Sequence, residues 1–313
     1  MKEFKTINII APCYNEELNI DEYLHRVLKT LEILKIDYKI FLIDDGSQDR
    51  TWEKILENCK KNKNIQGIKL SRNFGHQAAI MAGIEFANSK YVFFSDVDLQ
   101  DPPELLEQMY EKLINRKCNA VFGKRVKNNE NFIKKYSSIL FYKFFNLLSD
   151  IKISEQTSDF MLVDQKVLIE LKKIKDKDIF LRGIIPWYGF NIDYVEFERD
   201  KRKKGNSGWS FEKMIHFSLT ALLSFSNFPM RLSFFLSLIS IITFIFLICF
   251  AIYSYFINSA VRGWTSLFLI IAFFNTIIFF VLGIMAEYVG RTYLNSKNKP
   301  LYFIDKTSKH EDV

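Results

Sequence analysis

A group of carboxylates directly follows an apolar segment in the stretch YVFFSDVDLQDPPEL, residues 91–105. Asp96 and Asp98 share one face if the extended backbone of the apolar segment continues, because side chains along a strand alternate between two faces. Carboxylate oxygens suit Mg²⁺ and Mn²⁺, which commonly bind one or two carboxylates together with substrate phosphates. The same residue types also suit a polar turn, because Asp, Ser and Pro often end strands. This stretch alone leaves the cation site and the turn as open alternatives.

The elements that must position these carboxylates alternate regularly along the first 125 residues. Continuous apolar segments, each typical of a buried strand, lie at 7–12, 38–44, 65–70, 91–96 and 119–123. Amphipathic segments typical of helices lie between them at 17–34, 50–61, 76–87 and 103–115. This alternation predicts an α/β domain with a parallel sheet that is covered by helices on both faces.

Three further polar clusters follow the first three predicted strands, at 12–16, 44–49 and 71–76. Ligands of parallel sheets bind beyond the carboxyl ends of the strands, which is where all four clusters fall. The second cluster, DDGSQD, also suits a turn in which Gly46 permits a positive φ and Ser47 or Asp49 caps the next helix. Four such clusters at successive strand ends nevertheless favour a ligand site. The chain has neither G-x-G-x-x-G nor G-x-x-x-x-G-K-[ST], which disfavours a dehydrogenase or a P-loop NTPase.

Two segments near the C-terminus, 232–258 and 265–286, contain no charged residue. Each is long enough to cross a bilayer, which needs about 20 apolar helical residues, although a pair of buried core helices is the alternative. Their short connection predicts a helical hairpin. Basic residues lie before and after the hairpin, and only Arg262 lies in its turn. The positive-inside rule therefore predicts a multi-pass protein of the inner or plasma membrane with both termini in the cytoplasm.

The composition fits a cytoplasmic domain beside a membrane. A net charge of +7 suits anionic partners such as phosphates, anionic lipids or nucleic acid. Nucleic acid is not expected, because the basic residues concentrate beside a membrane span. The four cysteines are scattered without C-x-x-C spacing, which predicts reduced thiols. The predicted boundaries are 1–209 for the cytoplasmic domain, 210–230 for an interfacial helix, 231–290 for the hairpin and 291–313 for a cytoplasmic tail.

The motifs APCYNEE, LIDDGSQDRT, SRNFGHQAAIMAG and DVDLQDPPEL occur in this order. Together they resemble the family 2 glycosyltransferases of the GT-A fold. More narrowly, they resemble polyprenyl-phosphate glycosyltransferases, which include dolichyl-phosphate mannose synthase and bacterial enzymes that load sugars onto undecaprenyl phosphate. The two apolar segments and LGIMAEYVGRTYLNSKNKPLYFI resemble the bacterial branch. The resemblance covers nearly the whole chain.

The resemblance implies a donor site at the strand ends. Asp96, Asp98 and Gln100 would surround Mg²⁺ or Mn²⁺ on a nucleotide-sugar diphosphate. Asp98 and Gln100 are the expected direct ligands, whereas Asp96 would serve as a ligand or orient a cationic neighbour or the sugar. The residues expected around the nucleoside are Pro12, Tyr14, Glu16, Asp44 and Arg72.

The resemblance also implies an acceptor side. Arg125 would lie near the metal and the reacting phosphates, and Asp159 would act as a base or position the acceptor. Arg182 would be structural or contact phosphate, and Arg202 and Ser207 would bind phosphates in a loop that closes over the site. Ser158 and Met161 depart from the family, which usually has Gly and Arg there. Segments 132–150 and 210–230 suit helices at an anionic membrane surface.

The implied activity is transfer of one sugar, by default glucose from UDP-glucose, to undecaprenyl or another polyprenyl phosphate with inversion. A processive polysaccharide synthase of the same superfamily is an alternative. Such an enzyme would usually need more spanning helices and a Q-x-x-R-W motif, and the sequence has neither. Further alternatives are a glycosyltransferase with another acceptor and a catalytically inactive membrane scaffold of a glycan assembly or export system. The resemblance also leads us to expect a homo-oligomer, with a tetramer and a strand contact between subunits through YFIDKTSK as the working hypothesis.

Overall fold

The computed structural model describes residues 6–126, 157–174, 179–198, 263–297 and 299–308, together with short stretches between 235 and 253. The chain divides into two compact units. The first comprises residues 1–147, 151–217 and 300–313, and we call it the sheet domain. The second comprises residues 148–150 and 218–299, and we call it the apolar unit.

Within the described residues, the sheet domain is built on eight strands in the order β7-β5-β6-β4-β1-β2-β3-β8. The strands are β1 Thr6–Cys13, β2 Asp37–Asp44, β3 Ile65–Leu70, β4 Tyr91–Phe94, β5 Ala120–Val126, β6 Thr157–Asp164, β7 Ile192–Glu198 and β8 Ile304–Thr307. The helices are α1 Ile20–Leu34, α2 Thr51–Lys61, α3 His76–Phe86, the 3₁₀ turn η1 Pro103–Leu105, α4 Leu106–Asn115, α6 Gln165–Leu171 and α7 Leu181–Trp187. The five strands and four helices predicted in the first 125 residues are therefore confirmed.

The prediction of an all-parallel sheet is only partly correct. Strand β1 pairs in parallel with β2 and β4, and β2 pairs in parallel with β3. Strand β6, however, lies between β4 and β5 and is antiparallel to both. The apolar segments predict which residues form strands. They do not predict that β6, which comes later in the chain than β4 and β5, pairs between them. The sheet is consequently mixed.

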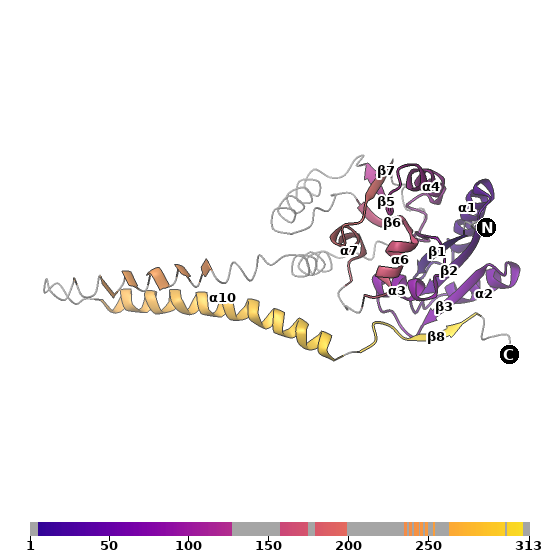
Figure 1. Ribbon diagram of the computed structural model, residues 1–313. Coiled ribbons are helices and arrows are strands. Elements are labelled where there is room, and N and C mark those ends of the chain that lie inside the picture. The colour runs from indigo at the N-terminus through magenta and orange to yellow at the C-terminus, as the bar shows by residue number, and fades with distance from the viewer. Residues whose placement is uncertain are drawn as a thin grey trace. The chain divides into compact units, whose positions relative to one another are not determined.

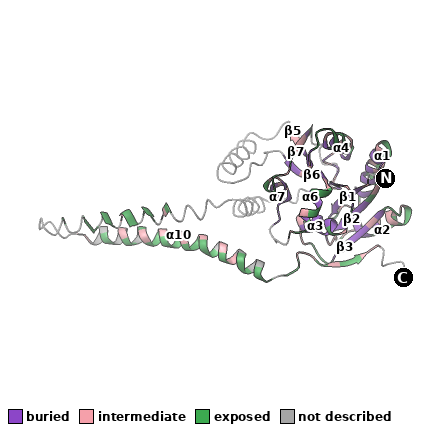
Figure 2. Ribbon diagram, viewed as in Figure 1, coloured by how far each residue is buried: buried purple, intermediate pink, exposed green. Residues whose placement is uncertain are grey.

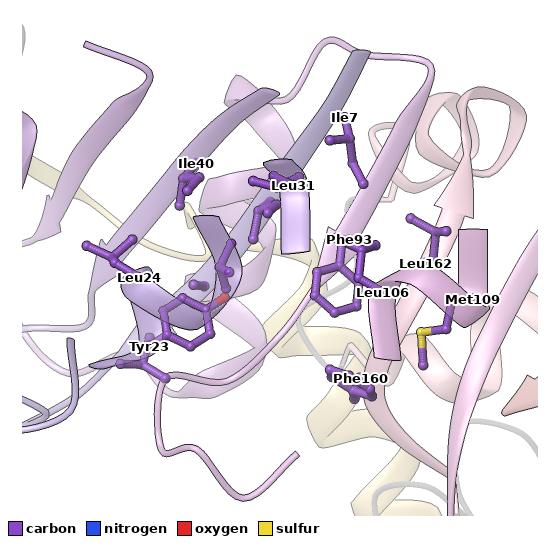
Figure 3. Close-up of a cluster of buried hydrophobic side chains, with 14 of the residues drawn as sticks. Ile7, Tyr23, Leu24, Leu31, Ile40, Phe93, Leu106, Met109, Phe160 and Leu162 are labelled. Atoms are coloured by element: carbon purple, nitrogen blue, oxygen red, sulfur yellow. The ribbon is translucent and has the colours of Figure 1, made fainter. Parts of the chain in front are cut away.

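Helices cover both faces of the sheet. In Figure 1, α1, α2 and α4 lie on one side of the strands, and α3, α6 and α7 lie on the other. Alternate residues of each strand face each layer, so Ile7 and Ile40 join Tyr23, Leu31 and other residues in the buried cluster of Figure 3. Burying side chains of this size stabilises the fold by about 1.5–3 kcal/mol each.

Helix α3 is buried along most of its length, from Ala78 to Ile84. A Cβ atom at Gly83 would overlap the Ile10 side chain and come within 3.0 Å of Ile43 Cδ1. The missing side chain therefore lets α3 pack closely on β1 and β2. This close packing fixes the start of α3, at His76, beside the carboxyl ends of these strands.

The C-terminal strand β8 pairs antiparallel with β3 of the same chain. This placement differs from the expected contact of YFIDKTSK with another subunit. The edge of a sheet presents unpaired backbone groups that any suitable strand can satisfy, and here the chain's own C-terminus does so.

The apolar unit contains α10, Trp264–Ser296, a helix of 33 residues. Among the described residues, it is the one helix long and apolar enough to cross a membrane, with the candidate span Phe273–Gly290. Its described apolar side chains are largely exposed, as Figure 2 shows. Asn275 Nδ2 donates to Ile271 O at 3.0 Å, so this polar group is satisfied within the helix. The first predicted span and the predicted interfacial helices lie largely or wholly outside the described residues.

Candidate active site

The carboxyl ends of β1, β2, β3 and β4 meet at one edge of the sheet. Cys13 pairs with Asp44 at the ends of β1 and β2, and Asp44 pairs with Lys69 near the end of β3. Beyond β4, Ser95 N donates to Ile10 O at 3.2 Å. Strand β6 runs the opposite way, so its first residues reach the same edge. The polar clusters predicted at successive strand ends are therefore brought together.

Asp44 ends β2 as a fully buried carboxylate. Its Oδ1 accepts from Ser47 N at 2.8 Å, and Lys69 Nζ lies 3.9 Å from Oδ2. Within the described part of the chain, Oδ2 has no hydrogen-bond partner. Buried polar atoms are usually satisfied, so Oδ2 is a candidate acceptor for a donor from outside the described residues, such as a bound molecule.

The loops after β1 and β2 are joined by reciprocal hydrogen bonds. Asn15, whose φ is 56°, donates its amide to Ser47 Oγ at 3.0 Å and accepts from Gln48 N through Oδ1 at 2.9 Å. Glu16 N donates to Thr51 Oγ1 at 2.8 Å. The Tyr14 side chain remains 44% exposed, whereas Pro12 is buried in β1. Tyr14 is thus available for stacking, and Pro12 forms part of the supporting sheet.

Asp45 and Gly46 position the loop of residues 71–75, which we call the Arg72 loop. The Asp45 carboxylate accepts from Phe74 N at 2.7 Å and from Gly75 N at 2.9 Å. Burial raises the pKa of Asp45, while these amides counteract the effect. At Gly46, whose φ is 69°, a Cβ atom would lie 2.6 Å from Arg72 Cα. The sequence analysis did not select Asp45, whose position beside Asp44 was the available signal.

The exposed Arg72 side chain lies over the Phe74 ring, with its guanidinium carbon 4.1 Å from the ring centroid. Its Nη1 donates to Asn73 O at 3.1 Å. Because the same loop is tied to Asp45, directly after Asp44, Arg72 belongs to the same end of the sheet as the buried carboxylate. Its expected place near a nucleoside stays a prediction.

A second cluster joins Asp96 and Asp159 through the first two residues of α3. His76 Nε2 lies 3.6 Å from Asp96 Oδ1 and 3.7 Å from Asp159 Oδ2. Gln77 Nε2 donates to Asp159 Oδ2 at 2.7 Å. Among the described residues, Asp159 Oδ1 and Gln77 Oε1 are buried without a hydrogen-bond partner. The sequence analysis quoted this histidine and glutamine within a motif but assigned no role to them.

The pKa of Asp96 is raised to about 6. Burial is the largest cause, and the carboxylates of Asp98, Asp101 and Asp159 add to it, while His76 acts in the opposite direction. The side chain is still 37% exposed, so the carboxylate remains accessible to a ligand. The convergence of negative charge on one accessible carboxylate is what a cation would relieve.

Arg125 is held at the site by an ion pair with Asp101, and its expected place near the metal and the reacting phosphates stays a prediction. Its guanidinium forms a bidentate pair with buried Asp101, with Nε–Oδ1 and Nη2–Oδ2 distances of 3.2 and 2.6 Å. Burial lowers the pKa of Arg125, but Asp101 outweighs this effect and raises it overall. Ser158 Oγ donates to Asp101 Oδ2 at 3.4 Å, so the family departure at this position adds a support for the pair.

The remaining residues that were predicted on the acceptor side lie in different environments. Arg182 Nη1 donates to Thr157 O at 3.0 Å, and its Nε lies 3.7 Å from Asp159 Oδ1, which favours a role in orienting Asp159. Met161 is fully buried in β6 between β4 and β5. Its side chain is therefore part of the core of the sheet domain. Arg202 and Ser207 lie outside the described residues.

Asp98 follows Asp96 in a turn where Asp98 Oδ1 accepts from Gln100 N at 3.1 Å. No group of three or more His, Cys, Asp or Glu side chains suited to a metal occurs among the described residues. Two carboxylates are nevertheless enough for Mg²⁺ or Mn²⁺ when substrate phosphates complete the coordination. The oxygen donors and the raised pKa of Asp96 fit such a cation.

The comparisons with known proteins agree with this geometry. Residues 8–172 match the model of glycosyl transferase family 2. The chain belongs to glycosyl transferase family 2. It is 36% identical over 302 residues to the uncharacterized glycosyltransferase YkcC of Bacillus subtilis, covering 96% of this chain and 93% of that protein. It is 31% identical over 305 residues to the bactoprenol glucosyl transferase of Shigella phage SfII, covering 97% and 98%.

The structural comparison supports the fold of this family 2 glycosyltransferase. Mannosyl-3-phosphoglycerate synthase from Rubrobacter xylanophilus matches with a TM-score of 0.51 and 12% identity, over 69% of this chain and 71% of that chain. The predicted family and the GT-A-like α/β fold of the sheet domain are thereby confirmed.

Proposed function

We propose that this glycosyltransferase transfers one sugar, by default glucose from UDP-glucose, to a polyprenyl phosphate at the cytoplasmic face of the membrane. The observation that carries the proposal is that one edge of the sheet holds both the buried Asp44 Oδ2, which has no hydrogen-bond partner among the described residues, and the Asp96–Asp98 pair. The first feature suits a nucleoside, and the second suits its cation-bound diphosphate.

On the donor side, Asp44 Oδ2 would accept from a base N–H, and the exposed Tyr14 would stack on the base. Arg72 and Glu16 would complete the nucleoside pocket with Pro12 behind them. Asp98 and Gln100, with Asp96, would hold Mg²⁺ or Mn²⁺. The cation would stabilise negative charge on the diphosphate leaving group.

On the acceptor side, the nucleophile is a phosphate oxygen. A phosphate monoester has a second pKa of about 6, so at neutral pH it is mostly dianionic and reactive without a dedicated base. Its oxygen forms a bond to the anomeric carbon as the bond to the diphosphate oxygen breaks. The nucleoside diphosphate leaves with the electron pair, and direct displacement inverts the anomeric centre.

Asp159 would position the acceptor in this scheme, held by Gln77 and oriented by Arg182. Arg125 would act through its pair with Asp101, keeping positive charge beside the site of sugar transfer. Arg202 and Ser207 remain proposed phosphate contacts. The similarity to a bactoprenol glucosyl transferase and the candidate span Phe273–Gly290 support a lipid acceptor and a membrane location.

The test is one reaction panel with protein in nanodiscs. The reactions contain short-chain polyprenyl phosphate, Mg²⁺ or Mn²⁺, and one of a set of nucleotide sugars. The masses of the lipid products are determined by mass spectrometry. We expect a mass gain of one sugar that EDTA abolishes and that Asp98→Ala lowers at least about 100-fold. Asp37→Ala is the matched control, because Asp37 is exposed at the opposite end of β2.

Absence of product with every donor, from folded wild-type protein, would contradict the proposal. A nucleotide-binding measurement would then separate the remaining alternatives. Cation-dependent binding would indicate a different acceptor, whereas no binding would indicate the inactive scaffold of a glycan assembly or export system.

A further inference from the structure

The C-terminal residues 302–308, which we call the C-terminal clasp, are hydrogen-bonded to the middle of β3 and to the residue that follows it. Ser71 N donates to Phe303 O at 3.0 Å, just after β3 ends. Within β3, Ser308 N donates to Gly67 O at 3.0 Å, and Gly67 N donates to Ser308 Oγ at 3.0 Å. Ser71 is the first residue of the Arg72 loop. The clasp therefore fixes the point at which that loop leaves the sheet.

A side-chain contact ties the clasp to α3 as well. The Tyr302 hydroxyl donates to Glu85 Oε2, near the end of the helix. Burial, this hydrogen bond and the charge of Glu85 raise the pKa of Tyr302, so its phenol stays a donor. The same helix begins with His76 and Gln77, which contact the carboxylates of Asp96 and Asp159.

The Arg72 loop is consequently held at both of its ends. Its end is held by Asp45, which accepts from Phe74 N and Gly75 N. Its start is held by the Phe303 carbonyl. Between these supports stands Arg72, whose backbone packs on Gly46 and whose side chain is exposed. Releasing either support would widen the range of positions open to Arg72.

We propose that the C-terminal clasp is a positioning element for the nucleotide-sugar donor, which it serves by fixing the Arg72 loop and α3. The inference rests on the proposed function for the identity of the ligand. It also links two parts of the sequence, because the clasp follows α10 after the connection 297–301. Donor binding by this chain would then require that the segment following its candidate membrane span be docked on β3.

The competing explanation is that β8 only pairs with the exposed edge of β3, because uncovered edge strands promote aggregation. That role would alter stability or aggregation without a selective effect on the donor. The two explanations differ in what happens to the Arg72 loop and to the Michaelis constants of the two substrates.

Hydrogen exchange tests the positioning without any assay of activity. The full-length protein is compared with a variant that ends at Pro300, both in nanodiscs. We expect amides 71–75 to exchange at least about fivefold faster in the variant, while segments 7–13 and 38–44 stay protected. Adding the peptide LYFIDKTSKHEDV, residues 301–313, should restore protection. Unchanged exchange in 71–75, with the core intact, would overturn the proposal.

Kinetics then test the consequence for the donor. Tyr302→Phe removes the hydroxyl that contacts Glu85, whereas Phe303→Ala removes an exposed ring and keeps the backbone carbonyl that Ser71 uses. We expect Tyr302→Phe to raise the donor KM about three- to tenfold with the lipid KM unchanged, and Phe303→Ala to change neither. Equal changes in both KM values would favour a purely structural role and overturn the proposal. If the wild-type protein has no activity, the proposed function fails while the exchange experiment still decides the role of the clasp.

Discussion

Gln77 is a neutral donor placed against Asp159, the less exposed of the two carboxylates beside His76. The Asp159 side chain is 9% exposed. Among the described residues, the hydrogen bond that its carboxylate accepts comes from Gln77 Nε2, at 2.7 Å. Neutral donation orients a carboxylate while leaving its negative charge largely intact. His76, in contrast, stands between Asp159 and Asp96 and is placed to hold these two carboxylates together.

We predict that Gln77→Leu lowers kcat about 10- to 100-fold with a smaller effect on nucleotide binding, because Asp159 loses its orientation. The buried carboxylate oxygen left without its donor should also cost about 1–3 kcal/mol in the free energy of unfolding. Steady-state kinetics, nucleotide titration and thermal unfolding measure the three effects. Gln165→Leu, at an exposed position on α6, is the matched control. An unchanged kcat in folded Gln77→Leu protein would contradict this role for Asp159.

The raised pKa of Asp96 makes stability depend on pH when no divalent cation is present. Because the pKa of about 6 in the folded protein exceeds the ordinary value of 3.8, the folded state binds a proton that the unfolded state releases between these values. The contribution of Asp96 to stability is therefore greatest below pH 4 and is lost as the pH rises through about 6. With a side chain 37% exposed, solvent screening reduces this effect to about 1 kcal/mol.

We predict that Asp96→Asn, measured in EDTA, is more stable than wild type at pH 7.5 and gains less, or nothing, at pH 5. Thermal unfolding at the two pH values gives the comparison, and Asp37→Asn controls for loss of any carboxylate. Cation affinity should fall in wild type below about pH 6, because binding then displaces a proton. Equal stabilisation by Asp96→Asn at both pH values would show that its pKa is ordinary.

At the scale of elements, most of the sheet domain could be predicted from local patterns. Apolar runs and amphipathic spacing give β1 to β5 and the helices between them, because burial on one or both faces leaves a period in the sequence. The position of β6 could not be predicted in this way. Its antiparallel insertion between β4 and β5 depends on long-range pairing, which leaves no period in the chain.

The same distinction separates the site residues that sequence reasoning found from those it missed. Asp44, Asp96 and Asp98 come at the ends of apolar segments. Their position at the carboxyl ends of the strands, where ligands of such sheets bind, could therefore be predicted from the sequence. Asp45 and Asp101 act by binding other groups of the protein, the amides of the Arg72 loop and the guanidinium of Arg125. Such partners lie 29 and 24 residues away, and only the fold brings them into contact.

At the scale of the whole molecule, the charge distribution still sets the strongest expectation about membrane placement. Residues 259–263 contain one basic residue, Arg262, between two segments without charge, whereas basic residues are frequent on both flanks. The positive-inside rule therefore predicts that this short turn faces the outside and that the sheet domain and C-terminus stay in the cytoplasm. The candidate span in α10 fits one arm of this hairpin.

The topology can be tested by cysteine labelling in a background without Cys13, Cys59, Cys118 and Cys249, once that background is shown to retain activity or its fold. In intact spheroplasts, we predict that a membrane-impermeant maleimide labels Ala260→Cys and leaves Lys63→Cys and Asp305→Cys unlabelled until the membrane is permeabilised. Lys63 and Asp305 are both exposed in the sheet domain, so a lack of labelling before permeabilisation reports the membrane barrier and not burial. Labelling of both Lys63→Cys and Asp305→Cys in intact spheroplasts would contradict the predicted topology. Labelling of Asp305→Cys alone would place the C-terminal clasp and β3 on opposite sides of the membrane, which would contradict the hydrogen bonds of the clasp to Gly67 and Ser71 as well.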